Sequence, residues 1–229
     1  MDLHPDIRFQ QVALGAERAP LLIVDNFVAA PEELVRTAAR KPFAPASSFF
    51  PGLRVKAPLS CQELYSKLKG TLQELFQLEG ATLRFSMCHY SLVTTPPEKL
   101  LLPQRIPHAD SLGREGLAAI HYLFKGNFGG TAFYRHRQTG FEYVDESRQQ
   151  RYIECVRAEL AGPNSPAAAY INGDTPLYEQ IASADAAFNR LLIYRRNSLH
   201  SGNIGRDFVP DSNPLTGRLS INSFLDFAP

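Results

Sequence analysis

The apolar pattern of this sequence changes its period near residue 80, and this change limits the fold more than any other feature. Before it, residues 31–41 and 61–78 place apolar side chains at helical spacing. After it, residues 82–93, "TLRFSMCHYSLV", alternate as a strand does. The alternation predicts one shared face for Leu83, Phe85, Met87 and His89. We therefore expect helices packed against a body rich in strands.

Further strand signals are short and separated by turn residues. Residues 20–27, "PLLIVDNF", are typical of a buried strand, and "LAAIHYLF" with "GTAFYRH" predicts a hairpin joined by the glycines of "KGNFGG". Residues 147–188 are predicted to be helical, and the last forty residues return to strands. These elements predict a single α+β domain over residues 1–229, an antiparallel sandwich or barrel with N-terminal helices packed on it and a helical insertion.

Composition excludes several classes of protein. The 229 residues can bury a substantial core, and the net charge of +1 predicts no nucleic-acid partner. No apolar run reaches the roughly 20 residues that span a bilayer, and the first residues lack the pattern of a secretory signal, so we expect no membrane partner. The cysteines, Cys61, Cys88 and Cys155, are odd in number and form no CxxC pair, which favours reduced thiols and a cytoplasmic location.

Three residues have the chemistry of metal ligands. His108 and Asp110 lie two apart in "IPHAD", and on a strand such a pair points to one side. His200, in "RRNSLHSG", is a candidate third ligand. Two histidines and one carboxylate leave open positions on a metal, as in non-heme Fe(II) oxygenases. The alternatives are a surface histidine beside a solvated acid and a loop or capping histidine.

The last strand carries a candidate anion site. "GRLSINSF" places Arg218, Ser220 and Asn222 on one face. A guanidinium inside a sheet needs a partner, and its fork of donors fits a carboxylate bidentately, while a nearby hydroxyl can add a hydrogen bond. An exposed arginine on a surface strand is the alternative. The order of His-x-Asp, distal His and Arg-x-Ser, each among apolar strands, favours a metal and carboxylate site.

Through these ordered motifs the sequence resembles the Fe(II)- and 2-oxoglutarate-dependent oxygenase superfamily, nearest its prolyl-hydroxylase-like branch. The resemblance covers most of the chain, from "DNFVAAPEELVRTA" through "FFPGLR" to "GRLSINSF". Through "PHAD" and "GGTAFYRHRQTGFE" it is similar to an uncharacterised bacterial family in that superfamily. It implies a double-stranded β-helix, a jelly-roll or cupin-like barrel of eight core strands with the metal at its open end.

The resemblance also implies roles for individual residues. His108, Asp110 and His200 would bind Fe(II), and Arg218, assisted by Ser220, would hold the distal carboxylate of the cosubstrate 2-oxoglutarate. The implied activity is a dioxygenase that uses O2 to hydroxylate its substrate. Because the halogenases of this superfamily lack the carboxylate ligand, Asp110 favours hydroxylation.

Two tyrosines and two histidines also lie on the predicted strands. Tyr122, in "AIHYLF", matches a strand tyrosine of prolyl-hydroxylase-like enzymes and is a candidate second contact to the cosubstrate carboxylate; a core tyrosine is the alternative. Tyr90 is a weaker candidate for the same pocket. His89 and His121 are interpreted as core histidines.

The substrate does not follow from the resemblance. Residues 147–188 and the loop "TTPPEKLLLPQRIP" are longer than a compact prolyl hydroxylase needs, and would shape a substrate pocket or form the contact of a homodimer. A second arginine, usual in nucleic-acid demethylases, is missing from "RLSINSFLDF". A peptide side chain, a free amino acid and a small metabolite all fit. Alternative functions are an inactive binding or sensing module and a cupin-like metalloenzyme that does not use 2-oxoglutarate.

Overall fold

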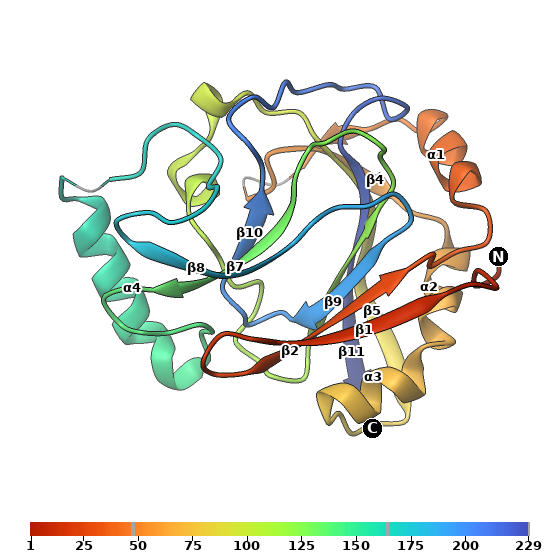
Figure 1. The fold of residues 1–229 in the computed structure, drawn as a ribbon, viewed down its shortest axis with the longest axis horizontal. Helices are drawn as coiled ribbons and strands as arrows, with labels where there is room; N and C mark the ends of the chain where they lie inside the picture. The colour runs from red at the N-terminus through yellow and green to blue at the C-terminus, as the bar shows by residue number, and fades with distance from the viewer. Residues whose placement is uncertain (47–48, 164, 229) are drawn as a thin grey trace.

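Two antiparallel sheets form the body of the protein in the computed structural model, which describes residues 1–46, 49–163 and 165–228 (Figure 1). In sheet order, the larger sheet contains β1 (Arg8–Leu14), β2 (Ala19–Asp25), β9 (Leu191–Arg195), β6 (Leu117–Tyr122), β11 (Leu219–Ala228), β5 (Thr82–Val93), β4 (Gly52–Lys56) and β3 (Ala44–Pro45). The smaller sheet contains β10 (His200–Asn203), β7 (Gly130–His136) and β8 (Tyr178–Ala184). The predicted strand-rich body is confirmed, as two separate sheets in the described residues.

Three N-terminal helices cover the outer face of the larger sheet. They are α1 (Pro31–Ala39), α2 (Leu59–Ser66) and α3 (Lys69–Phe76). Their apolar sides pack with outward-facing residues of the sheet in one buried cluster, which includes Leu34, Leu64, Leu72, Leu117 and Ile221. The predicted packing of N-terminal helices is therefore confirmed, although residues 61–78 form two helices instead of one.

The inner face of the larger sheet packs against the smaller sheet. The rings of Phe133 on β7 and Tyr194 on β9 meet edge to face, with centroids 5.0 Å apart. Tyr122 on β6 and Thr131 on β7 share a buried hydrogen bond of 2.7 Å between their hydroxyls. These contacts, with apolar residues around them, hold the two sheets face to face.

The hairpin predicted between β6 and β7 is wrong. β6 pairs with β9 and β11 in the larger sheet, whereas β7 pairs with β10 and β8 in the smaller one. The glycines between them let the chain change sheets at a tight crossing. Gly129 has φ +73°, and a Cβ on Gly130 would lie 1.9 Å from the Ala184 carbonyl oxygen, so side chains are excluded there.

The predicted helical insertion is half correct. Its first part is α4 (Glu146–Leu160), which begins at Asp145, whose side chain accepts a hydrogen bond from the Arg148 backbone N–H. Residues 178–184, predicted as helix, form β8 instead. Pairing with β7 buries Tyr178 and Ala184 at its two ends, and this long-range contact overrides the local helical pattern. Two short 3-10 helices, Pro97–Lys99 and Leu102–Arg105, lie in the long loop before His108.

A bulge changes which way the side chains of β5 face. The register between β5 and β11 shifts between Phe224 and Leu225. Leu83 and Phe85 consequently pack in the helix-covered cluster, whereas Met87 accepts a hydrogen bond from Arg54 on the other face. Leu83 and Phe85 therefore share one face of β5, and Met87 and His89 share the other. The prediction of a single face for all four residues is wrong.

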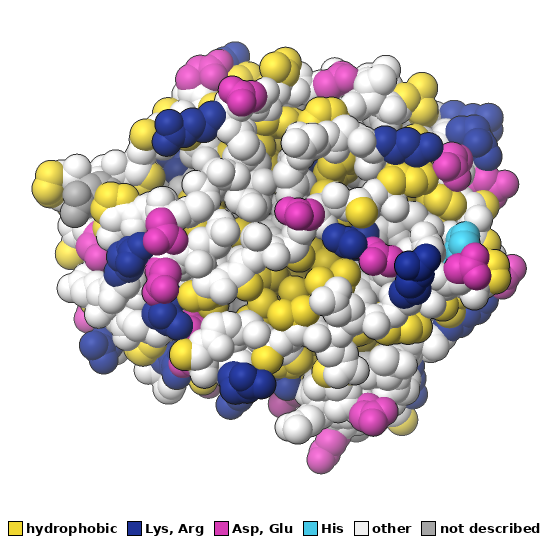
Figure 2. Space-filling view, viewed as in Figure 1, with side chains coloured by type: hydrophobic (Ala, Val, Ile, Leu, Met, Phe, Trp, Pro, Cys, Tyr) yellow, Lys and Arg dark blue, Asp and Glu magenta, His cyan; other side chains and the backbone are white. Residues whose placement is uncertain are grey.

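The surface has no dominant sign of charge on the face seen in Figure 2, where acidic and basic side chains are interspersed. This agrees with the net charge of +1. No helix in the described part of the chain combines the length and apolar character needed to cross a bilayer.

Candidate functional site

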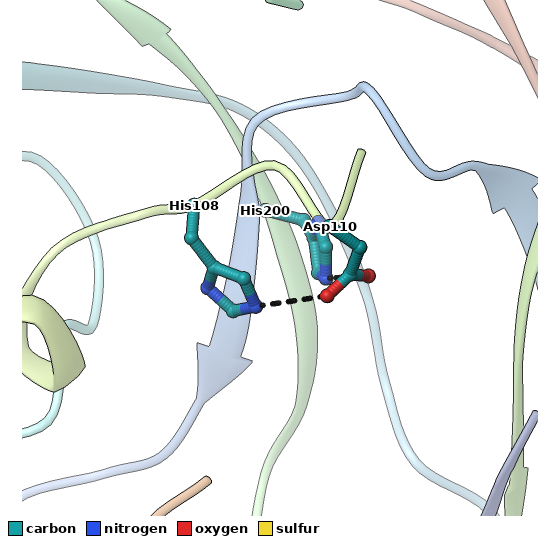
Figure 3. A group of neighbouring side chains, drawn as sticks. All are labelled: His108, Asp110 and His200. Carbon is teal, nitrogen blue, oxygen red and sulfur yellow. Dashed lines mark ion pairs between the residues drawn. The ribbon is translucent and has the colours of Figure 1, made fainter. Parts of the chain in front are cut away.

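The side chains of His108, Asp110 and His200 converge on one another (Figure 3). One potential ligand atom from each lies within 4.8 Å of the others. The His108 Nε2 atom is 3.6 Å from Asp110 Oδ1, and His200 Nε2 is 3.4 Å from Asp110 Oδ2. A metal ion placed among these atoms would meet two imidazole nitrogens and one carboxylate oxygen, the donor set of a non-heme iron centre.

Backbone pairing brings these three residues together. His108 and His200 form an isolated antiparallel bridge, with N–H to carbonyl distances of 2.9 and 3.0 Å in the two directions. The Asp110 N–H donates to the Arg196 carbonyl at 2.7 Å. His108 and Asp110 lie in a loop, so the strand argument from their i, i+2 spacing does not explain their alignment. Their loop is instead fastened to the segment from Arg196 to His200.

The His200 ring is held in one tautomer and one orientation. Its Nδ1 atom is 3.0 Å from the Ser198 carbonyl oxygen, which fixes the proton on Nδ1 and leaves the Nε2 lone pair toward Asp110. Burial lowers the pKa of His200 to about 4, so the ring is neutral at pH 7. The Tyr194 ring packs 4.7 Å away, centroid to centroid, and restricts its rotation.

Asp110 complements this imidazole. Burial opposes ionisation of its carboxyl group, but the neighbouring His200, His108 and Arg54 outweigh burial and hold its pKa below the usual range. A neutral histidine beside an ionised carboxylate is the protonation state that a divalent cation requires. The three side chains thus fit a metal ion in geometry and in charge.

Arg218 is a buried cation with no acidic partner in the described residues. Its side chain donates from Nε to the Phe128 carbonyl and from Nη2 to the Gly130 carbonyl, each at 2.9 Å. Only 6% of the residue is exposed, and burial lowers its pKa. A guanidinium this buried is costly without a counter-ion, and carbonyl dipoles supply only part of the compensation. The surroundings of Arg218 therefore favour an anionic ligand.

Arg218 lies close to the metal ligands. A Cβ on Gly202 would be 3.9 Å from Arg218 Nη2. Gly202 is two residues after His200 on β10, a separation of roughly 7 Å along a strand, and shares a face with it. A ligand with carboxylates at both ends can therefore reach both the metal ligands and the guanidinium.

Ser220 and Tyr122 lie beside Arg218, and Tyr90 does not. Ser220 is opposite Tyr122 in the β11–β6 pair, and the Tyr122 ring is 5.9 Å from the Arg218 Cζ atom. Tyr90 is opposite Ile221, in the cluster beneath the helices, and its buried hydroxyl has no hydrogen-bond partner among the described residues. The structure places Tyr90 on the far face of the sheet from the candidate site.

Sequence reasoning missed two residues of this region. Tyr194, which packs on His200, follows a run of apolar residues that indicates only a buried strand. Arg54, on β4, lies near Asp110, and the Asp110 carboxylate raises its pKa against the larger effect of burial. Its position in "GLRVK" gives no sign of this, because β4 reaches the site only through pairing with β5.

The chain belongs to a family of unknown function, DUF6445, whose sequence profile matches residues 5–225. A comparison with curated protein sequences found no match.

Solved structures share the fold at low sequence identity. HygX from Streptomyces hygroscopicus, with nickel and 2-oxoglutarate bound, is 12% identical, with a TM-score of 0.50 over 90% of this chain and 82% of HygX. The same protein with nickel, 2-oxoglutarate and hygromycin B bound gives 10% identity, a TM-score of 0.50 and the same coverages. SnoN, a non-heme α-ketoglutarate-dependent epimerase from nogalamycin biosynthesis, is 13% identical, with a TM-score of 0.48 over 93% of this chain and 82% of SnoN. The match to HygX confirms the predicted resemblance at the level of the fold.

Proposed function

We propose that this protein is an Fe(II)- and 2-oxoglutarate-dependent oxygenase, a single domain that hydroxylates a small molecule or a peptide side chain. The observation that carries the proposal is the pairing of a metal-ligand triad with a buried arginine that lacks an acidic partner. The two facing sheets would be those of a double-stranded β-helix. HygX, which shares the fold, binds 2-oxoglutarate with nickel, and this supports the choice of cosubstrate.

Each side chain has a distinct task in this proposal. His108, Asp110 and His200 hold the metal. Arg218 pairs with the distal carboxylate of 2-oxoglutarate, and Ser220 lies beside Arg218 on the same face. When bound, iron and 2-oxoglutarate supply the activation of O2 and the oxidation of a C–H bond. The buried position of Arg218 strengthens its attraction for the carboxylate, because little water screens the charges.

The test is calorimetric titration of 2-oxoglutarate into protein loaded with Mn(II), a redox-inert substitute for Fe(II). Arg218→Met should weaken 2-oxoglutarate binding by about 30-fold or more, since it removes one partner of a buried charge pair worth roughly 2–5 kcal/mol. Mn(II) affinity should stay within about threefold of wild type. Arg8→Gln, which removes an exposed arginine from the edge strand β1, is the matched control for the lost charge.

Unchanged 2-oxoglutarate binding in Arg218→Met would contradict the assignment of Arg218. Absence of 2-oxoglutarate binding to wild type would contradict the function itself. Succinate release with Fe(II), ascorbate and a pool of candidate substrates then separates an oxygenase from a binding module, because a module would bind 2-oxoglutarate without converting it.

A further inference from the structure

A second arginine, Arg54, faces the same inner space and forms no ion pair in the described residues, although the Asp110 carboxylate lies near enough to raise its pKa against the larger effect of burial. Its Nε donates to the Ser91 hydroxyl at 3.0 Å, and Nη1 makes a weak contact of 3.7 Å with the Met87 sulfur. The guanidinium lies 4.0 Å above the centroid of the Phe50 ring. These contacts use two of its five N–H donors and fix the orientation of its plane.

Arg54 and Arg218 occupy different positions on one face. Arg54 is opposite Ser91, and Ser91 is opposite Ser220, so all three share a face with Arg218, two residues before Ser220. One strand, β5, separates β4 from β11, which places Arg54 roughly 10 Å from Ser220 across the sheet, with Arg218 two residues further along the chain. The two guanidinium groups are held by different elements, because Arg218 donates to the carbonyls of Phe128 and Gly130, whereas Arg54 contacts Ser91 and Met87. If Arg218 holds 2-oxoglutarate, Arg54 is left for another anion.

One polar atom near Arg54 also lacks a partner. His89 is the next inward-facing residue on β5, opposite Asn222 of β11, and its buried Nδ1 has no hydrogen-bond partner among the described residues. Burial, with Arg54 and Lys56 nearby, lowers the pKa of His89, so its ring is neutral at pH 7. Buried polar atoms are nearly always paired, and an unpaired one beside a guanidinium that forms no ion pair indicates a polar ligand.

The surroundings of Arg54 restrict water. Phe50, which stacks on Arg54, packs against an apolar cluster of Val93, Leu100, Tyr170, Ile204 and Phe208. Val93 ends β5, and the other four residues lie in loops that are far apart in the sequence or follow β10. Because these apolar side chains exclude water, they strengthen a charge-assisted hydrogen bond that Arg54 makes beside them.

We propose that Arg54 binds a carboxylate of the substrate and that the substrate class is a small carboxylic acid. The inference rests on the proposed function, because it assigns Arg218 to the cosubstrate. Arg54 lies near Asp110, so its positive charge also offsets the repulsion between that ligand and an incoming acid. The acid would be held by its carboxylate at β4 with the rest of the molecule directed toward the metal ligands.

The test uses matched acids and amides with the Mn(II)- and 2-oxoglutarate-loaded protein. The probes are N-acetyl-L-leucine, phenylacetate and hexanoate, each beside its primary amide, with inorganic phosphate as a competitor. Relaxation of probe protons by Mn(II) reports binding near the metal without turnover. We expect at least one acid to bind about tenfold more tightly than its amide in wild type and in Arg8→Gln. Arg54→Gln should reduce that acid to the level of its amide.

Three results would overturn the inference: no acid preferred over its amide in wild type, full acid preference in Arg54→Gln, or phosphate alone competing for the site. Titration of 2-oxoglutarate into Arg54→Gln should give an affinity within about threefold of wild type. Loss of cosubstrate binding would assign Arg54 to 2-oxoglutarate instead.

Arg54→Lys keeps the charge and loses the fork of donors, so it should retain part of the preference for the acid. It provides a second variant if Arg54→Gln does not fold. Failure of the proposed function is separate, because it appears as loss of 2-oxoglutarate binding in wild type.

Discussion

Histidines that look alike in the sequence have different tasks at the scale of the residue. His200 faces the Asp110 carboxylate, whereas His121 lies on the opposite face of the sheet, packed against Phe27. His121 Nε2 donates to the Asn189 side-chain oxygen at 3.0 Å, and Asn189 in turn bonds both backbone groups of Val28. The interpretation of His121 as a core histidine agrees with this environment.

His121 should make stability depend on pH. Burial lowers its pKa to about 4 from an ordinary value near 6.5, so the unfolded chain takes up the proton first. The stability present above pH 6.5 is therefore lost as the pH falls toward 4, by on the order of 3 kcal/mol at this residue. Urea unfolding between pH 4 and 7 should show a smaller loss in His121→Gln than in wild type. If the free energy of unfolding falls equally with pH in the two proteins, the pH dependence comes from groups other than His121.

At the scale of the element, the Glu142 carboxylate connects three segments of the chain. Glu142 accepts hydrogen bonds at 2.9 Å from the backbone N–H groups of Ala16 and Glu17, in the turn between β1 and β2. It also pairs with Arg135 on β7 at 2.5 Å. Although burial opposes its ionisation, these partners hold the pKa of Glu142 below its usual value. The edge hairpin is thereby fastened to the smaller sheet.

Gly15 allows this contact, and its replacement should be costly. Its φ is +55°, and a Cβ there would lie 2.3 Å from the Glu142 Oε2 atom. Gly15→Ala should lower the free energy of unfolding by about 2–4 kcal/mol, measured by urea denaturation. Gly140→Ala is the matched control, because Gly140 has φ +74° with nothing near the Cβ position. It should cost only about 1 kcal/mol. Equal decreases in the free energy of unfolding for the two variants would show that the Glu142 side chain moves aside without destabilising the protein.

Metal binding should couple distant segments at the scale of the whole molecule. His108 and Asp110 come from the loop before β6, and His200 from β10 of the other sheet, so an ion among them joins parts far apart in the chain. Mn(II) at 100 times its dissociation constant should add about 2.7 kcal/mol of stability, a rise in Tm of about 5–10 °C for a chain of this size. Differential scanning calorimetry should show EDTA reversing the rise and Asp110→Ala abolishing it. A full rise in Asp110→Ala would place the ion elsewhere.

The sequence by itself determined the parts of this protein that depend on local spacing and on chemical type. Helical periodicity predicted α1 and the region of α2 and α3, and alternation on the last strand predicted one face for Arg218, just before β11, and Ser220, within it. The candidate ligands were recognisable because imidazole, carboxylate and guanidinium groups are rare among apolar strands and occur here in an informative order. The resemblance to 2-oxoglutarate oxygenases followed from that order.

Only the tertiary structure decided how strands pair and which face each side chain occupies. A strand finds its hydrogen-bond partner far along the chain, so local patterns predicted a hairpin for β6 and β7 and a helix for β8, and both were wrong. One bulged residue reversed the faces of β5, and pairing alone put Tyr90 beneath the helices and Arg54 near Asp110. The physical reason is that side-chain direction in a sheet repeats every two residues, so a shift of one residue, invisible in composition, moves a group from the core to the site.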